Sequence, residues 1–127
     1  MNTKTEVKSP VSTESLNDLI IDSIQDIKGK NILKLDLRKL DDAPAEFFII
    51  CEGDSNTQVK AIADNIQARL KKEALTLPSH YEGQQNALWI CLDYFHIVVH
   101  VFYRETRQFY QLEDLWSDAI FTEYDSL

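Results

Sequence analysis

The segment Gly53-Asp54-Ser55 has residue types that could bind a phosphate group. It lies between an apolar run that predicts a strand and a helical pattern, so free helix amides would point toward an anion. Enzymes that transfer nucleotides use such turns, but they also need paired carboxylates just beyond, spaced Asp-x-Asp, for metal ions. Asn56 and Thr57 follow Ser55 instead. We therefore expect Ser55 to cap the helix, and a nucleotidyltransferase, active or degenerate, is the alternative.

Cysteine and histidine side chains could bind zinc or form a nucleophile and base. The candidates are Cys91, His96 and His100. If both histidines lie in one strand, their four-residue separation places them roughly 13 Å apart, too far for one ion. Cys51 and Cys91 lie in apolar runs and lack the cationic, exposed setting that lowers a thiol pKa. We expect no catalytic residue, no metal and no cofactor.

Aromatic residues beside a carboxylate could form a protein-contact surface near residue 90. Trp89 is followed by Asp93, Tyr94 and Phe95, and aromatic anchors supply much of the energy of many interfaces. A tryptophan in an apolar run is also a good core residue, and the residue pattern alone favours the core. Both roles stay open on this pattern.

Composition limits the class of protein. The chain has 127 residues, of which 44% are hydrophobic, and a formal net charge of −8. One domain of this length can bury its own core. Its apolar runs are far shorter than the roughly 20 residues that span a bilayer, and its first residues lack an apolar export signal. We expect a cytoplasmic protein without membrane contact. Its acidity disfavours direct nucleic-acid binding, including sequence-specific binding, and favours a basic protein partner.

The hydrophobic pattern predicts the elements that position these residues. A helix begins near Thr13, with Gly29 expected as its left-handed cap, and a second helix follows Ser55, which has capping-box spacing to Gln58. Strands are predicted near residues 31–37, 47–51, 88–92 and 97–103, the last two as an antiparallel hairpin, and a helical tail over 105–120.

This order of elements indicates an α/β (α+β) fold, a single layered domain with a mixed β-sheet flanked by helices. The domain is predicted to span residues 13–121. Residues 1–12 are predicted to be a flexible N-terminal tail, and residues 122–127 a C-terminal tail.

Short motifs along the chain resemble those of the ribosomal silencing factor family, also called the Iojap-like family. Each motif is short, so the resemblance lies in their order and spacing between about Leu16 and Ala119. The matching residues are Asp22, Asp26-Ile27, Lys34-Leu35-Asp36, Gly53-Asp54-Ser55, Gln58-Val59, Ala61-Ile62-Ala63-Asp64, Glu82-Gly83, Trp89-Ile90-Cys91-Leu92-Asp93-Tyr94, Ile97-Val98-Val99-His100-Val101-Phe102, Glu105, Arg107, Tyr110, Leu112-Glu113, Leu115-Trp116 and Asp118-Ala119.

The resemblance implies a fold, a partner and a mechanism. The fold would be related to that of nucleotidyltransferases. The protein would be non-enzymatic, bind the large ribosomal subunit through its fourteenth protein, and sterically block the small subunit, which represses translation when nutrients are scarce. The implied partner surface consists of Trp89, Leu92, Asp93, Tyr94 and Phe95.

One departure from the family pattern lies in this surface. Most members have Gly-Asp where this chain has Phe95-His96, and glycine permits a positive φ that phenylalanine resists. The turn there is thus expected to differ. A further alternative is a self-associating module, in which the sheet surface around Trp89 forms a homodimer when the protein is free of the ribosome.

Overall fold

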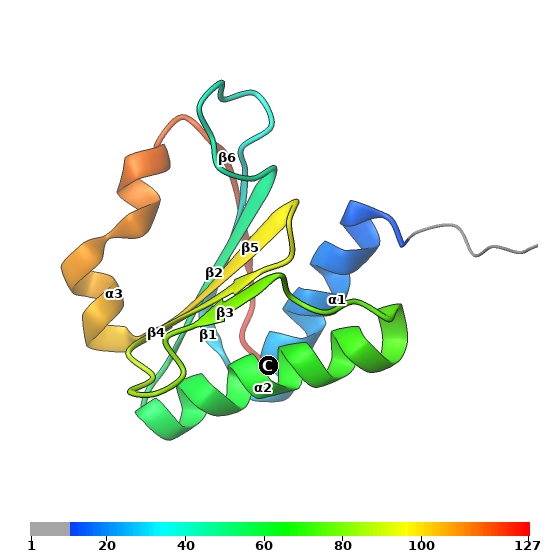
Figure 1. The fold of residues 1–127 in the computed structure, drawn as a ribbon. Coiled ribbons are helices and arrows are strands. Elements are labelled where there is room, and N and C mark those ends of the chain that lie inside the picture. Colours follow the sequence, from blue (N-terminus) through cyan, green and yellow to red (C-terminus); the bar gives the residue numbers. More distant parts are fainter. Residues whose placement is uncertain (1–10) are drawn as a thin grey trace, which may run out of the picture.

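Helices and strands are interspersed along residues 11–127, the part of the chain that the computed structural model describes (Figure 1). In order they are α1 (Thr13–Asp26), β1 (Lys30–Asp36), β2 (Phe47–Gly53), α2 (Asn56–Ala74), β3 (His80–Glu82), β4 (Trp89–Asp93), β5 (Ile97–Tyr103), α3 (Arg104–Tyr110), the 3₁₀ helix η2 (Leu112–Trp116) and β6 (Ile120–Tyr124). Most of the predicted N-terminal tail, residues 1–10, lies outside the described residues.

The strands form one mixed sheet in the order β3-β4-β5-β2-β1-β6. β2 and β5 pair in parallel, whereas β4 and β5 form the antiparallel hairpin that the sequence predicts. The expected α+β domain with a mixed sheet is therefore confirmed. Among residues 11–127, no helix combines the length and the apolar character needed to cross a membrane.

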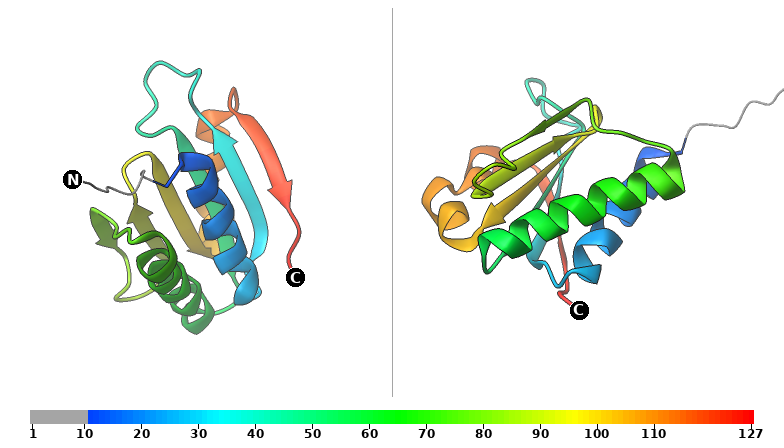
Figure 2. Two further views of the ribbon diagram at one scale, coloured as in Figure 1. Left: turned by 90° about the vertical axis from the view of Figure 1, so that its right-hand side faces the viewer. Right: turned by 60° about the horizontal axis from the view of Figure 1, so that its bottom comes forward.

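Both faces of the sheet are covered. α1 and α2 pack on one face, called here the helix face, and α3 lies over the opposite face (Figures 1 and 2). The opposite face has a smaller core, with Leu112 and Trp116 of η2 packed against it. Every residue of β2 is buried, as its continuous apolar run predicts for a strand covered on both faces. The buried side chains of that smaller core are Leu35, Leu37, Phe48, Ile50 and Phe102.

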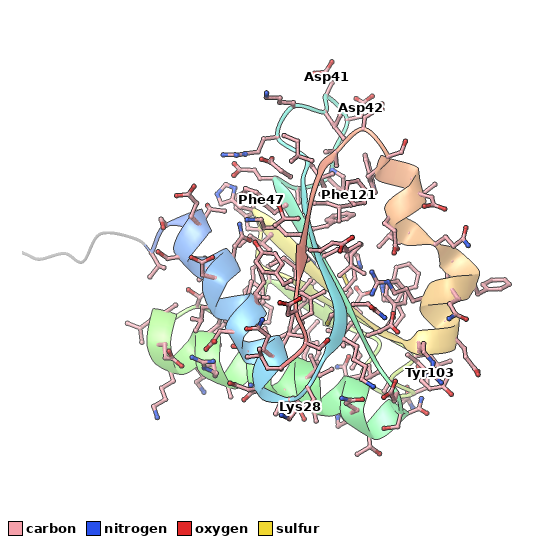
Figure 3. The ribbon with its side chains drawn as sticks, turned by 180° about the vertical axis from the view of Figure 1, so that it is seen from behind. Lys28, Asp41, Asp42, Phe47, Tyr103 and Phe121 are labelled. Carbon is pink, nitrogen blue, oxygen red and sulfur yellow. The ribbon has the colours of Figure 1, made fainter. Side chains whose placement is uncertain are left out.

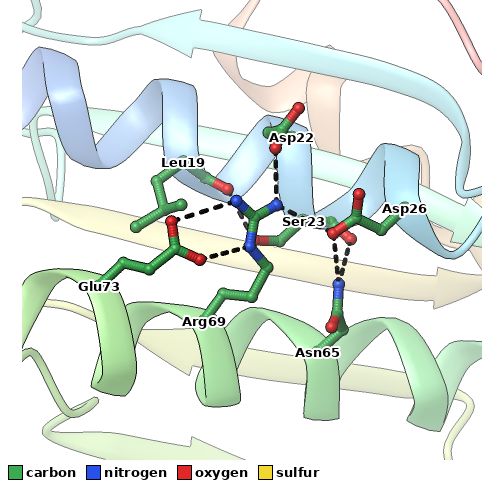
Figure 4. A network of polar contacts seen from close by, with 7 residues as sticks. All are labelled: Leu19, Asp22, Ser23, Asp26, Asn65, Arg69 and Glu73. Carbon is green, nitrogen blue, oxygen red and sulfur yellow. Dashed lines mark hydrogen bonds and ion pairs between the residues drawn. The ribbon is translucent and has the colours of Figure 1, made fainter.

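Arg69 joins the two helices that cover the helix face (Figure 4). Its guanidinium binds Asp22 and Asp26 of α1 at 2.6 and 2.9 Å, and Glu73 of α2 at 2.7 Å. Nearby, the side-chain amide of Asn65 donates to the carbonyl of Ser23 at 2.8 Å. The carboxylates raise the pKa of Arg69, mainly through its hydrogen bond to Glu73. This network holds the two helices in register.

The end of α1 differs from the prediction that Gly29 would be its left-handed residue. Lys28 adopts that conformation, with φ of 63°. The Lys28 amide donates to Gln25 and the Gly29 amide to Ile24, both at 3.0 Å, which is the hydrogen-bond pattern of a Schellman motif. Gly29 is required for another reason, because a Cβ atom there would collide with Cγ2 of Ile24.

The start of α2 confirms the predicted cap. The Ser55 hydroxyl accepts from the Gln58 amide at 3.1 Å. The Gln58 side chain accepts from the Asp54 amide at 2.7 Å, one residue before the position in a standard capping box. It also donates to the carbonyl of Ile27 at 3.1 Å, so the cap ties α2 to the end of α1.

Replacing the cap residue should cost little but measurable stability. Ser55→Ala is expected to lower the free energy of unfolding by about 1 kcal/mol, because the Gln58 amide loses its acceptor. Ser55→Asp should retain most of the stability that the cap contributes, since aspartate also caps helices. Thr57→Ala, at an exposed position in the first turn of the helix, is the control and should change stability by less than about 0.5 kcal/mol. Urea melts of the three variants test this; an unchanged midpoint in Ser55→Ala would contradict the cap.

The C-terminal region differs most from the sequence prediction. The predicted helical tail over 105–120 is broken at Gln111, which has a φ of 48°, into α3 and η2. Ile120–Tyr124 then forms β6, antiparallel to β1, so the predicted tail over 122–127 begins inside a strand. β-branched and aromatic residues at 120–122 favour a strand once β1 offers an edge. Leu115 of η2 is 73% exposed, so this segment does not bury a continuous apolar stripe as one amphipathic helix would.

Candidate partner-binding surface

The β4–β5 hairpin divides the predicted contact residues between the two faces of the sheet. Trp89 and Asp93 are half-buried and lie on the face opposite the helices. Leu92 and Tyr94 are buried in the helix-face core, with exposed fractions of 0% and 6%. The prediction that Leu92 and Tyr94 contact a partner is therefore corrected, because side chains that alternate along a strand cannot share one face.

Phe95 is exposed at the tip of this hairpin. Its φ is 77°, and the His96 amide donates across it to the Tyr94 carbonyl at 3.0 Å, which makes a tight γ-turn. The Asp93 carboxylate supports the turn by accepting from the Phe95 amide at 2.8 Å. The side chain is 75% exposed, so no core contact explains a phenylalanine in this conformation. Strained backbone of this kind is often kept at functional sites.

The strain at Phe95 can be measured with a matched pair of variants. Phe95→Gly and Phe95→Ala remove the same ring, but only glycine adopts a positive φ without a steric penalty. We expect the glycine variant to exceed the alanine variant in free energy of unfolding by about 1 kcal/mol. Equal stabilities in denaturant melts would show that the turn is unstrained or reforms differently.

Trp89 combines a core contact with an exposed edge. Its ring stacks on Phe102 with the ring centroids 4.7 Å apart, and its Nε1 donates to Nδ1 of His100 at 3.1 Å. Trp89 therefore has a structural role in the core, as the residue pattern alone favours. The rest of the ring, with neighbouring half-buried or exposed side chains, forms what we call the hairpin surface: Trp89, Cys91, Asp93, Phe95 and Val98.

Exposed aromatic residues of α3 extend this surface, although the sequence pattern did not predict them as contact residues. Phe109 is 81% exposed and Tyr110 53%, and the Tyr110 ring lies 5.1 Å from that of Trp89. With Leu88 and Tyr103 they border a hollow of about 370 Å³. Because two adjacent residues of one short helix cannot both face inward, the Phe109-Tyr110 pair could have indicated an exposed aromatic residue in the sequence.

Arg107 fixes α3, and so positions these aromatic residues. Its side chain is only 7% exposed and binds Glu52 of β2 and Glu113 of η2, each at 3.1 Å. It also donates to the carbonyl of Asn31 at 2.6 Å. One buried cation thereby joins α3, η2 and the sheet.

The possible phosphate-binding turn is occupied by the protein's own groups. Asp54 accepts from Lys30 at 2.7 Å and from Arg104 at 3.2 Å, and the hydrogen bond from Lys30 is the main cause that lowers the pKa of Asp54. Ser55 already accepts from the helix amide. A phosphate would have to displace Asp54 from both cations. Among residues 11–127, no cluster of three or more His, Cys, Asp or Glu side chains could hold a metal ion.

The cysteine and histidine candidates do not form a common site. Burial raises the pKa of Cys51 to about 12 and that of Cys91 to about 11, which keeps both thiols protonated. His96 is exposed and its Nδ1 lies 3.3 Å from a Glu46 carboxylate oxygen. His100 is buried beside Phe48, with ring centroids 4.6 Å apart, and burial lowers its pKa to about 4. Each side chain has a separate structural environment.

The buried His100 predicts loss of stability in mild acid. The unfolded chain takes up this proton near pH 6.5, but the folded protein does so only near pH 4. The contribution of neutral His100 to the free energy of unfolding is therefore fully present above pH 6.5. It is lost as the pH is lowered toward 4, which reduces the stability by about 2 to 3 kcal/mol. His100→Gln should flatten this dependence, whereas His80→Gln, at an exposed position, should leave it unchanged. Denaturant melts between these pH values decide; the same slope in His100→Gln would contradict the assignment.

Comparison with known proteins gives one consistent family. Residues 10–127 match the family model described as ribosomal silencing factor during starvation. A ribosomal silencing factor of Chromobacterium violaceum is 37% identical over 103 residues, 81% of this chain and 83% of the relative. One from Halalkalibacterium halodurans is 32% identical over 117 residues, 92% of this chain and 98% of the relative. The crystal structure of a Chromobacterium violaceum protein superposes with a TM-score of 0.79 at 37% identity, covering 84% of this chain and 88% of that one.

Proposed function

Because the chain belongs to the ribosomal silencing factor family, we propose that it binds the large ribosomal subunit and blocks its association with the small subunit. The proposed contact is the fourteenth protein of the large subunit, which the family resemblance implies. Binding there would occupy the space that the small subunit needs, and translation would fall when nutrients are scarce. The mechanism is steric and requires no reaction.

The hairpin surface is the observation that carries this proposal. It presents Trp89 and Phe95 on the β4–β5 hairpin, which is paired on both sides within the sheet, and Asp93 lies between them in the chain. The exposed aromatic residues of α3 lie beside Trp89. Aromatic anchors next to a polar group are typical of the energetic centre of a protein interface. The net charge of −8 favours a basic protein over RNA as the directly contacted partner.

Sedimentation with separated ribosomal subunits tests this assignment. We expect the protein to travel with large subunits and not with small subunits, and purified fourteenth protein added in excess should compete. Equal recovery with both subunits, or recovery that the competitor does not reduce, would contradict the proposed partner.

We also propose that the protein acts without catalysis. The support is the occupied turn at Gly53-Asp54-Ser55, where Asp54 forms ion pairs with both Lys30 and Arg104. Titration calorimetry with nucleoside triphosphates and Mg²⁺ should give no binding heat. Metal-dependent nucleotide transfer that disappears in Ser55→Ala would instead favour the nucleotidyltransferase.

Self-association of the free protein is a second candidate. The exposed fractions of Phe95 and Phe109, 75% and 81%, leave apolar area that a homodimer could cover in the absence of a ribosome. Sedimentation equilibrium at several concentrations tests this: a dimer that Phe109→Ser dissociates supports it, and a monomer throughout excludes it.

A further inference from the structure

The outer edge of β6 is an unpaired strand edge. β6 is the last strand of the sheet and pairs with β1 alone among the described residues, over Ile120–Tyr124. Figure 2 shows β6 in red at the border of the sheet beside β1, and Figure 3 shows the same strand from behind, with Phe121 labelled. Ile120 and Phe121 are 56% and 41% exposed. Strand edges with free amides and carbonyls can accept a further strand.

β6 lacks the features that usually protect such an edge. Proteins blunt strand edges with lysine, proline, bulges or very short strands. At the opposite edge, β3 has only three residues and follows soon after Pro78. β6 has five residues, contains neither lysine nor proline, and keeps an unbroken register with β1. One edge of the sheet is therefore closed to strand addition, and the other is open.

The charge near β6 selects the kind of strand that could be added. The 20 residues after Arg107 contain no lysine, arginine or histidine, but they contain five carboxylates: Glu113, Asp114, Asp118, Glu123 and Asp125. A second copy of the chain would bring two acidic edges together, which is unfavourable. A cationic segment would be attracted to the edge.

The face positions on β6 give the pattern that such a segment needs. Phe121 and Glu123 lie opposite Leu35 and Leu33 of β1, so both project to the face away from α1 and α2. Beside Glu123 is a hollow of about 420 Å³ that Asp125 and Arg107 also border. A lysine or arginine opposite Glu123 could reach the carboxylates at this rim, and an apolar residue two positions away would cover Phe121.

We propose that β6 binds an extended, cationic segment of a partner protein by strand addition. Backbone pairing along β6 supplies affinity, and Glu123 with Asp125 supplies selectivity for positive charge. The surface lies at the other end of the sheet from the hairpin surface, because β4 and β6 are separated by β5, β2 and β1. It is therefore a second site, and its test does not depend on ribosome binding.

A synthetic peptide that repeats Lys-Thr-Val-Thr twice is the probe, since its alternate residues place lysine and valine on one face. Binding to the full chain is measured by fluorescence anisotropy at low salt. A second peptide of the same sequence carries N-methyl groups on alternate backbone nitrogens, which keeps the charge but blocks strand pairing. We expect the methylated peptide to bind about tenfold or more weakly, because affinity in strand addition comes from the main chain.

Protein variants separate charge recognition from general acidity. The double variant Glu123→Gln, Asp125→Asn should weaken binding of the unmethylated peptide by about fivefold to tenfold. The double variant Glu14→Gln, Asp18→Asn removes the same charge from α1, at exposed positions, and should bind normally. Equal binding of both peptides, or equal loss in both variants, would reduce the effect to charge attraction and overturn the proposal. A free-protein dimer that buries the amides of β6 would assign the edge to a second copy and overturn it as well.

Discussion

Replacing Arg107 by methionine is expected to lower the free energy of unfolding by about 3 to 5 kcal/mol. The guanidinium is almost fully buried and binds Glu52, whose side chain is also only 7% exposed. Without Arg107, Glu52 would be a buried charge with no partner, Glu113 would lose its bond, and the Asn31 carbonyl would lose its donor. α3 would then be held mainly by apolar packing.

Arg104→Met is the matched control, because it removes the same group from the same helix. Arg104 is 49% exposed and bonds to an exposed carboxylate on Asp54, so its loss should cost less than about 1 kcal/mol. Replacing Glu52 by leucine together with Arg107→Met should recover much of the loss, since the unpaired charge disappears. Denaturant melts give the comparison. Equal costs for Arg107→Met and Arg104→Met would refute the role of Arg107 as the buried anchor of α3.

Trp89→Ala should weaken binding to the large subunit by about thirtyfold to a thousandfold, equivalent to about 2 to 4 kcal/mol. Loss of the exposed part of the ring would leave a gap in the interface. The same change also removes stacking on Phe102 and the bond to His100, so stability should fall by roughly 2 kcal/mol. Affinity must therefore be measured on the folded fraction.

Trp116→Ala is the control that separates loss of core packing from loss of a partner contact. Trp116 is half-buried and packs on the same face of the sheet, with its ring 5.9 Å from Phe48, but it lies outside the hairpin surface. We expect a similar loss of stability and nearly normal affinity. If Trp89→Ala protein that remains folded binds as well as the unchanged protein does, Trp89 is a core residue and the contact surface lies elsewhere.

The sequence predicted those elements of the fold that depend on residues close together in the chain. The cap at Ser55 follows from its spacing to Gln58, and the buried β2 follows from its continuous apolar run; both are present. β6 was missed because the predicted helix ended at residue 120 and residues 122–127 were assigned to a tail. Only the free edge of β1 makes the strand favourable. Tertiary context decides such segments.

The candidate surface was predictable in part. The hairpin and its turn were located correctly, but Leu92 and Tyr94 were placed on the wrong face. The family motif implied a contact surface made of nearly consecutive residues, whereas side chains along a strand point alternately to its two faces. Arg107 gave no signal of burial, since a charged residue in a helical pattern usually faces solvent. Its partner Glu52 lies 55 residues earlier in the chain. Only the folded structure brings the two together.

Subunit joining is the most direct test of the proposed steric block. Separated large and small subunits are mixed under associating conditions with increasing amounts of the protein, and the joined ribosomes are measured by light scattering and gradient sedimentation. The account predicts that joined ribosomes fall and free subunits rise as the large subunits become saturated, and that Trp89→Ala requires a correspondingly higher concentration. Unchanged joining at saturating protein would contradict the account, even if the protein binds the large subunit.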